Sequence, residues 1–142
     1  MTQPLFLTSQ RLITAHWPAV ERLLEPVLEA ARGEFTIDDL ENLCRDGHAV
    51  AGVLFDPHPV LAMVFEFRHY PRKTVLNVIA IGGANLSAAR TFWPKFLVWA
   101  RESGADEVEA CTAPAMSRML RPLGFEHTYN VVRCSTGEPA CH

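Results

Sequence analysis

The sequence predicts a single α/β domain (α+β) in which helices flank a mixed, mostly antiparallel central sheet. The order of hydrophobic patterns along the chain predicts the elements β-α-α-β-β-β-α-β-α-β. Three closely spaced strand-like runs in the middle are joined by short turns, which is typical of an antiparallel meander. A strand-helix-strand crossover follows and adds a parallel pair. The chain has 142 residues, of which 49% are hydrophobic and 20% charged, enough to bury one core.

The first part of the chain is predicted to form a strand and two helices. A short apolar stretch over Leu5–Ile13 is typical of a strand. Apolar residues at helical spacing predict a helix over Trp17–Arg32, with Pro18 in its first turn. Thr36 is a good N-cap for a second, shorter helix over Ile37–Arg45.

The middle of the chain changes to strand-like patterns. Ala49–Phe55 and Val60–Arg68 are two apolar runs, and the turn residues between them predict a hairpin. A third run, Thr74–Ile81, is apolar on both faces except for Asn77. Such a run is typical of a central strand that is covered on both sides.

The second half is predicted to hold two helices and two strands. Apolar residues surround most of the helix predicted over Ser87–Glu102, so we expect it to be buried on more than one side. Val108–Thr112 is predicted as a strand, Pro114–Leu120 as a short helix and Phe125–Cys134 as a last strand. No linker or repeat interrupts this order, so we expect one domain over residues 1–134 and a flexible tail over 135–142.

Composition excludes several classes of function. The formal net charge of −3 gives no general attraction to nucleic acid or to an anionic membrane. No apolar run is long enough to span a bilayer, and the chain start does not resemble a secretory signal, so a cytoplasmic location is expected. The cysteines form no C-x-x-C pair and the histidines are scattered, so we expect no metal site.

Two motifs lie at matching places in the second half. Trp99–Ala105 reads WARESGA at the end of the long predicted helix, and Arg118–Glu126 reads RMLRPLGFE before the last predicted strand. With the element order, they resemble the GNAT acetyltransferase superfamily, in which W-A-x-x-x-G-x leads into the fifth strand and L-G-F-E closes the fourth helix. The resemblance in sequence runs from about Val75 to Val132.

The resemblance implies that acetyl-CoA, or another short acyl-CoA, is the co-substrate. In the superfamily the pantetheine arm lies in a V-shaped opening between the fourth and fifth strands, here Thr74–Ile81 and Val108–Thr112. The pyrophosphate binds backbone N–H groups at the start of the next helix, and such a terminus suits an anion because it presents unpaired donors. The implied contact residues are Ile79, Ala80, Ile81, Ala84, Asn85, Leu86, Ser87, Ala88 and Ala89.

The phosphate-binding pattern R/Q-x-x-G-x-G/A falls on Ala84–Ala89, where it is altered. Ala84 takes the place of the Arg or Gln, and Ser87 and Ala89 take the places of the glycines. Small residues still let a phosphate approach the backbone, but the positive side chain is absent. An alternative interpretation of this segment is a plain strand-to-helix turn with a serine N-cap.

The catalytic residues of the superfamily are also altered. Leu120 stands where a tyrosine protonates the departing thiolate, and Ala113 where an asparagine is expected. Tyr129, on the next predicted strand, is the substitute acid. Glu66 and Asn77 are the polar interruptions of two central strands, and Glu66 is the candidate general base. Alternatively, Glu66 lies on the solvent face of an amphipathic strand.

Two hypotheses of function follow. The first is an acyl-CoA-dependent N-acyltransferase with weakened catalysis, whose acceptor is an amine on a small molecule or a protein. The alternative is a non-catalytic GNAT-like module that acts as a phage structural or host-interaction protein. It rests on a resemblance to small GNAT-like proteins of tailed phages, in length and over residues 119–126, and implies a virion-associated location. Apolar faces also leave a homodimer open.

Overall fold

The computed structural model describes residues 3–29, 34–83, 86–111, 118, 120–129 and 131–137. The chain divides into two compact units, residues 1–111 and residues 112–142. The first unit contains β1 (Gln3–Leu7), α1 (Gln10–Glu29), α2 (Ile37–Arg45), β2 (Val50–Phe55), β3 (Pro59–His69), β4 (Thr74–Gly83), α3 (Leu86–Glu102) and β5 (Glu107–Ala110). The second contains η1, a 3-10 turn over Arg121–Leu123.

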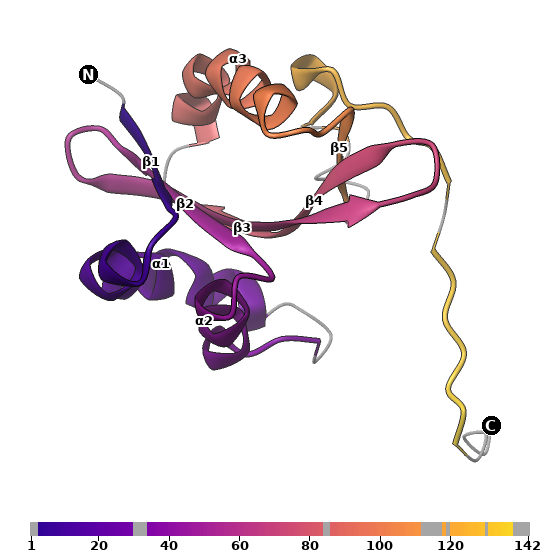
Figure 1. Ribbon diagram of the computed structural model, residues 1–142, viewed down its shortest axis with the longest axis horizontal. Coiled ribbons are helices and arrows are strands. Elements are labelled where there is room, and N and C mark those ends of the chain that lie inside the picture. Colours follow the sequence, from indigo (N-terminus) through magenta and orange to yellow (C-terminus); the bar gives the residue numbers. More distant parts are fainter. Residues whose placement is uncertain are drawn as a thin grey trace. The chain divides into compact units, whose positions relative to one another are not determined.

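Five strands of the first unit form one sheet in the order β1-β2-β3-β4-β5. The pairs β1–β2, β2–β3 and β3–β4 are antiparallel, and β4–β5 is parallel. Helices α1 and α2 pack on one face of this sheet and α3 on the other (Figure 1). The predicted fold class, a mixed and mostly antiparallel sheet flanked by helices, is therefore confirmed.

The first helix begins earlier than predicted. α1 begins at Gln10, so residues 10–13, which were expected in the first strand, are helical. The cause is Ser9, whose Oγ accepts a hydrogen bond from the backbone N–H of Leu12 at 3.2 Å. A serine in this position caps a helix N-terminus. Pro18 consequently lies inside the helix and not in its first turn.

The second helix has the predicted bounds, Ile37–Arg45. Thr36 Oγ1 accepts a hydrogen bond from the Asp39 N–H at 3.1 Å, and the Asp39 carboxylate accepts one from the Thr36 N–H at 2.9 Å. This reciprocal pair is a capping box. At the other end, the backbone oxygen of Arg45 accepts a bond from Gln10 Nε2 at 2.7 Å, which joins α2 to the start of α1.

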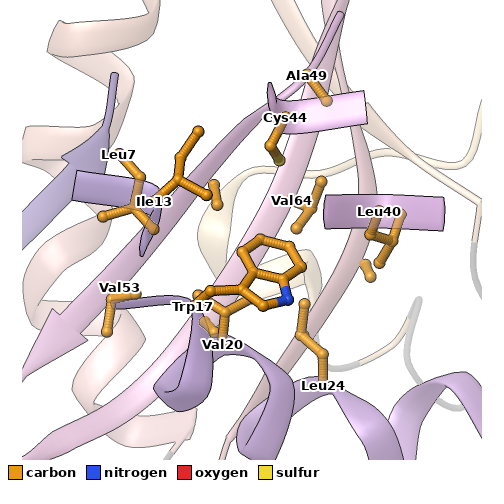
Figure 2. Close-up of a cluster of buried hydrophobic side chains, with 13 residues drawn as sticks. Leu7, Ile13, Trp17, Val20, Leu24, Leu40, Cys44, Ala49, Val53 and Val64 are labelled. Carbon is orange, nitrogen blue, oxygen red and sulfur yellow. The ribbon is translucent and has the colours of Figure 1, made fainter. Parts of the chain in front are cut away.

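The two faces of the sheet bury different kinds of side chain. On the α3 face, Phe65 and Phe96 are fully buried, and Phe6 stacks on Trp99 with ring centroids 4.1 Å apart. The face under α1 and α2 is mainly aliphatic around a single indole, that of Trp17 (Figure 2). Its larger members are Leu7, Ile13, Val20, Leu24, Leu40, Val53 and Val64. The central strands β3 and β4 are thus packed from both sides.

The predicted last strand, Phe125–Cys134, is not a strand at any of its described positions. A strand needs a neighbouring edge to satisfy its backbone hydrogen bonds, and no described strand pairs with this segment. Its side chains are largely exposed, and Val132 is 90% exposed. The aromatic and β-branched residues of this segment are therefore typical of a strand, but the described residues lack the pairing that forms one.

The other predictions for this part of the chain are met only in part by described residues. The strand predicted over Val108–Thr112 is seen as Glu107–Ala110, and Thr112 lies outside the described residues. Of the helix predicted over Pro114–Leu120, Arg118 and Leu120 are helical and the rest lies outside. The division into a domain over residues 1–134 and a flexible tail over 135–142, of which 138–142 lie outside the described residues, stays a prediction.

Candidate functional site

Strand β4 changes its pairing halfway along its length. Over Val75–Val78 it pairs on both sides, with β3 and with Glu107–Ala110 of β5. Over Ala80–Gly83 it pairs with β3 alone among the described residues. The register with β3 shifts at Ile79, which has no residue directly opposite. A bulge of this kind bends its strand, and it lies where the pairing with β5 ends.

Two glycines end β4 because neighbouring backbone lies too close for a side chain. A Cβ on Gly83 would lie 2.2 Å from the backbone oxygen of Val60 and 2.8 Å from Leu61 Cα. A Cβ on Gly82 would lie 2.6 Å from the backbone oxygen of Leu23 in α1. The glycines therefore hold the end of β4 against β3 and α1, which fixes the point from which the chain enters α3.

The residues predicted to contact acyl-CoA fall on the end of β4 and the start of α3. Ile79–Ile81 lie in the second half of β4, where Ala80 is buried and the other two are half-buried. Leu86–Ala89 form the first turn of α3, whose backbone N–H groups have no partner within the helix. Ala84 and Asn85 lie outside the described residues.

Glu66 and Asn77, the predicted polar residues, lie directly opposite each other in the β3–β4 ladder. Asn77 Nδ2 donates a hydrogen bond to Glu66 Oε1 over 3.5 Å, and Asn77 is only 6% exposed. Their chain neighbours Phe65 and Leu76 are buried under α3. Because side chains alternate along a strand, Glu66 and Asn77 lie on the opposite face, the one on which α1 and α2 pack.

Arg68 and Glu109, which no sequence motif indicated, lie beside this pair. Arg68 Nε donates a hydrogen bond to Glu66 Oε1 at 3.0 Å, which is the main cause that raises the pKa of Arg68. Arg68 Nη1 lies 3.6 Å from Glu109 Oε1. Glu109 pairs with Asn77 in the parallel ladder. We call Glu66, Arg68, Asn77 and Glu109 the polar cluster, to which three adjacent strands contribute.

Tyr129, the third predicted catalytic residue, belongs to the second unit. It is 70% exposed. Leu120, at the expected tyrosine position, is half-buried, and Ala113 lies outside the described residues. The role of Glu66 as base and that of Tyr129 as acid remain predictions.

A hollow of about 330 Å³ lies elsewhere in the first unit, between the C-terminal half of α3 and β5. Among the described residues, no group of three or more His, Cys, Asp or Glu side chains could hold a metal ion. No helix within the described ranges has the length and apolar character needed to cross a membrane.

Comparisons with known proteins identify the fold. No protein-family model and no curated protein sequence matches the chain. The structure of AAC(6')-Iy with the bisubstrate analogue CoA-S-monomethyl-acetylneamine matches with a TM-score of 0.70 at 15% identity, over 96% of this chain and 99% of that one. The aminoglycoside 6'-N-acetyltransferase AAC(6')-Ih from Acinetobacter baumannii matches with a TM-score of 0.68 at 14% identity, over 98% and 100%.

A third solved structure is a predicted acetyltransferase from Clostridium acetobutylicum with acetyl-CoA. It matches with a TM-score of 0.65 at 11% identity, over 95% of this chain and 96% of that one. At these low identities the likeness concerns the fold. The chain has the fold of GNAT acetyltransferases, as its sequence motifs predict.

Proposed function

We propose that the protein is an acyl-CoA-dependent N-acyltransferase that transfers an acetyl or other short acyl group to an amine. The observation that carries the proposal is the change in pairing along β4. β4 pairs with β5 over Val75–Val78, a bulge follows at Ile79, and beyond it the described part of β5 offers no partner. In the GNAT fold this is where the pantetheine arm is expected. Among the structural neighbours, one was solved with acetyl-CoA and another with a CoA-based bisubstrate analogue.

The residues present fit such a co-substrate. The second half of β4 has an edge that no other described strand pairs with, and amide groups of an extended arm can bind such an edge as an added strand does. α3 begins at Leu86, directly beyond this half of β4, and a helix N-terminus favours phosphate. With Ala84 in place of an arginine, we expect the backbone to supply most of the affinity for the pyrophosphate.

The reaction requires one bond to form and one to break. The nitrogen of a neutral amine attacks the thioester carbonyl, an amide bond forms, and the carbon–sulfur bond breaks to release the thiolate. The amine loses one proton, which Glu66 would accept directly or through a water, and the thiolate gains one, for which Tyr129 is the candidate donor. A single acid or base contributes about 10²–10⁴-fold, so correct positioning of the two substrates supplies much of the rest.

The structural neighbours suggest where to look for the acceptor. AAC(6')-Ih is an aminoglycoside N-acetyltransferase, and another neighbour, meta-AAC0020, was solved with sisomicin. Both act on or bind small molecules that carry several amines. Small amines with more than one ammonium group are therefore the first acceptors to test.

Calorimetry with acetyl-CoA tests the proposal most simply. We expect saturable binding by one site, followed by release of the CoA thiol when sisomicin or a smaller amine is added. Substitution of Ser87 or Ala89 by tryptophan is expected to weaken binding and leave the thermal midpoint nearly unchanged. Unchanged affinity in both variants would place the pyrophosphate elsewhere. No binding of acetyl-CoA at all would contradict the proposal and favour the non-catalytic module.

A further inference from the structure

Within the polar cluster, Glu109 lacks a close partner. Its Oε1 atom is shielded from solvent and accepts no hydrogen bond from any described residue. The cation beside it, Arg68 Nη1, lies 3.6 Å away, beyond hydrogen-bonding distance. A shielded carboxylate oxygen without a donor is unfavourable, so a donor that approached more closely would be stabilised there.

Arg68 can leave Glu109 at little cost. Its side chain is 48% exposed, and its short contact is with Glu66 and not with Glu109. Exposed ion pairs of this type contribute little to stability. Asn77 contacts Glu66 from β4, so the Glu66 carboxylate keeps a partner when the guanidinium moves.

The position of Glu109 relates it to the proposed opening. The pair Asn77–Glu109 directly precedes Val78–Ala110, the last pair of the β4–β5 ladder. A group bound at Glu109 would therefore lie next to the point where the described pairing ends. The two carboxylates of the polar cluster face a single guanidinium, so the cluster carries one uncompensated negative charge that favours a further cation.

We propose that Glu109 binds the ammonium group of the acceptor amine, which takes the place of the Arg68 guanidinium beside Glu109 Oε1. That this amine is the acyl acceptor rests on the proposed function, whereas binding of its ammonium group does not require acyl-CoA. A primary ammonium is compact and has three N–H donors, and it can approach a carboxylate to about 2.8 Å. The Arg68 guanidinium, which is held by Glu66, does not come that close. Glu109 is thus a specificity-determining residue, and Arg68 competes with the ligand.

Calorimetric titration of butane-1,4-diamine into the full chain without acyl-CoA tests this proposal, with butane-1,4-diol as the uncharged control ligand. We expect the diamine to bind and the diol not to bind. Glu109→Gln should weaken diamine binding about tenfold or more, because the charge-assisted contact is lost. Arg68→Gln should increase the affinity for the diamine about threefold, because it removes a cation that competes for Glu109 and interacts with it only weakly.

Glu107→Gln is the matched control. Glu107 lies on the same strand two residues away, its side chain is 53% exposed, and it pairs with Lys73. This variant also removes one negative charge, so it reports the general electrostatic effect, and we expect the affinity for the diamine to change less than about twofold. A loss as large as that in Glu109→Gln would overturn the proposal. Weaker binding in Arg68→Gln would also overturn it, because Arg68 would then support the ligand.

A second readout uses the unmodified chain, so it does not depend on whether a variant folds. The proposal predicts that the NMR signal of the Arg68 Nε–H shifts on titration with the diamine and stays in place with the diol. A signal that the diamine leaves unmoved would contradict displacement of the guanidinium. Acetyl-CoA affinity measured in parallel separates this proposal from the proposed function. Failure of diamine binding alone removes the ammonium site, and failure of acetyl-CoA binding alone removes the acyltransferase.

Discussion

Both halves of β4 are mainly apolar, but they differ in the number of described neighbouring strands with which they pair. In the first half, Leu76 is fully buried and the strand pairs on both sides. In the second half, beyond the bulge at Ile79, the strand pairs with β3 alone among the described residues and ends in two closely packed glycines. One strand therefore completes the sheet with its first half, and its second half has an edge that no described strand pairs with, where we propose that the ligand binds. We expect substitutions in the first half to affect stability and those near the second half to affect binding as well.

The largest effect on stability is expected at Leu76. Leu76→Ala removes a fully buried side chain from the core under α3 and should lower the free energy of unfolding by about 3 kcal/mol. Ile81, in the second half, is only half-buried, so Ile81→Ala should lower it by about 1.5 kcal/mol. Urea unfolding measures both values. Equal decreases in the free energy of unfolding would contradict the difference between the two halves of β4.

At Gly83, the last residue of β4, a side chain is expected to lower the free energy of unfolding. Gly83→Ala would place a Cβ 2.2 Å from the backbone oxygen of Val60, and overpacking of this kind costs about 2–3 kcal/mol. Gly52→Ala in β2 is the matched control, because its Cβ would meet the Phe6 ring at 3.4 Å. We expect the free energy of unfolding of that variant to change by less than about 1 kcal/mol. Similar losses in the two variants would show that the close contact is not the cause.

Catalysis is expected to depend on Glu66 more than on Tyr129. If Glu66 is the base, Glu66→Gln should lower kcat about 100-fold and remove the ascending limb of the pH–rate profile. Tyr129→Phe should lower kcat less than about tenfold, because Tyr129 is largely exposed. Steady-state rates of CoA thiol release over a pH series provide the measurement. A retained ascending limb in Glu66→Gln would assign the base elsewhere.

The smallest effect is expected where β5 begins. Asp106 Oδ2 accepts a hydrogen bond from the Thr74 N–H at 2.9 Å, and the Asp106 N–H donates one to the Thr74 oxygen at 2.7 Å. Asp106→Ala removes only the side-chain bond and should lower the free energy of unfolding by about 1 kcal/mol. Asp106→Asn keeps an acceptor and should lose less. Unchanged thermal midpoints in both would show that this contact does not hold β5 to β4.

Local chemistry explains which parts of the fold the sequence could predict. Helix α2 was predicted at its observed bounds because Thr36 caps it within its own first turn. The start of α1 was missed because Ser9, its cap, lies inside an apolar stretch that has the composition of a strand. The strand expected over Phe125–Cys134 has aromatic and β-branched residues that are typical of strands, but composition does not supply a partner edge.

The candidate site was harder to predict because it depends on register. Glu66 and Asn77 were both singled out, yet their contact follows from pairing between two strands. The bulge at Ile79 leaves no signal because β4 is apolar on both faces, and a shift of one residue then keeps the same pattern. Glu109 could have been found, since it alternates with Val108 and Ala110 on a predicted strand.

Three of the four cysteines provide probes for the central claim, that an acyl-CoA binds where the pairing of β4 with β5 ends. Cys111 directly follows β5 and is exposed, and Cys134, in the second unit, is also exposed. Cys44 is buried in α2, where burial, with a smaller effect of Glu41, raises the pKa of its thiol to about 11. At pH 8 Cys44 is therefore almost entirely protonated and should not react, because the thiolate is the nucleophile.

The decisive measurement is the rate at which iodoacetamide alkylates each of these three cysteines at pH 8, followed by mass spectrometry. It is made with and without a CoA thioether, which contains no thioester and therefore transfers no acyl group. We predict that the thioether slows alkylation of Cys111 to a small fraction of its rate and leaves Cys134 unchanged, with Cys44 unreactive in both cases. Alkylation of Cys111 at the same rate in the presence of saturating thioether would contradict the claim that this opening binds acyl-CoA.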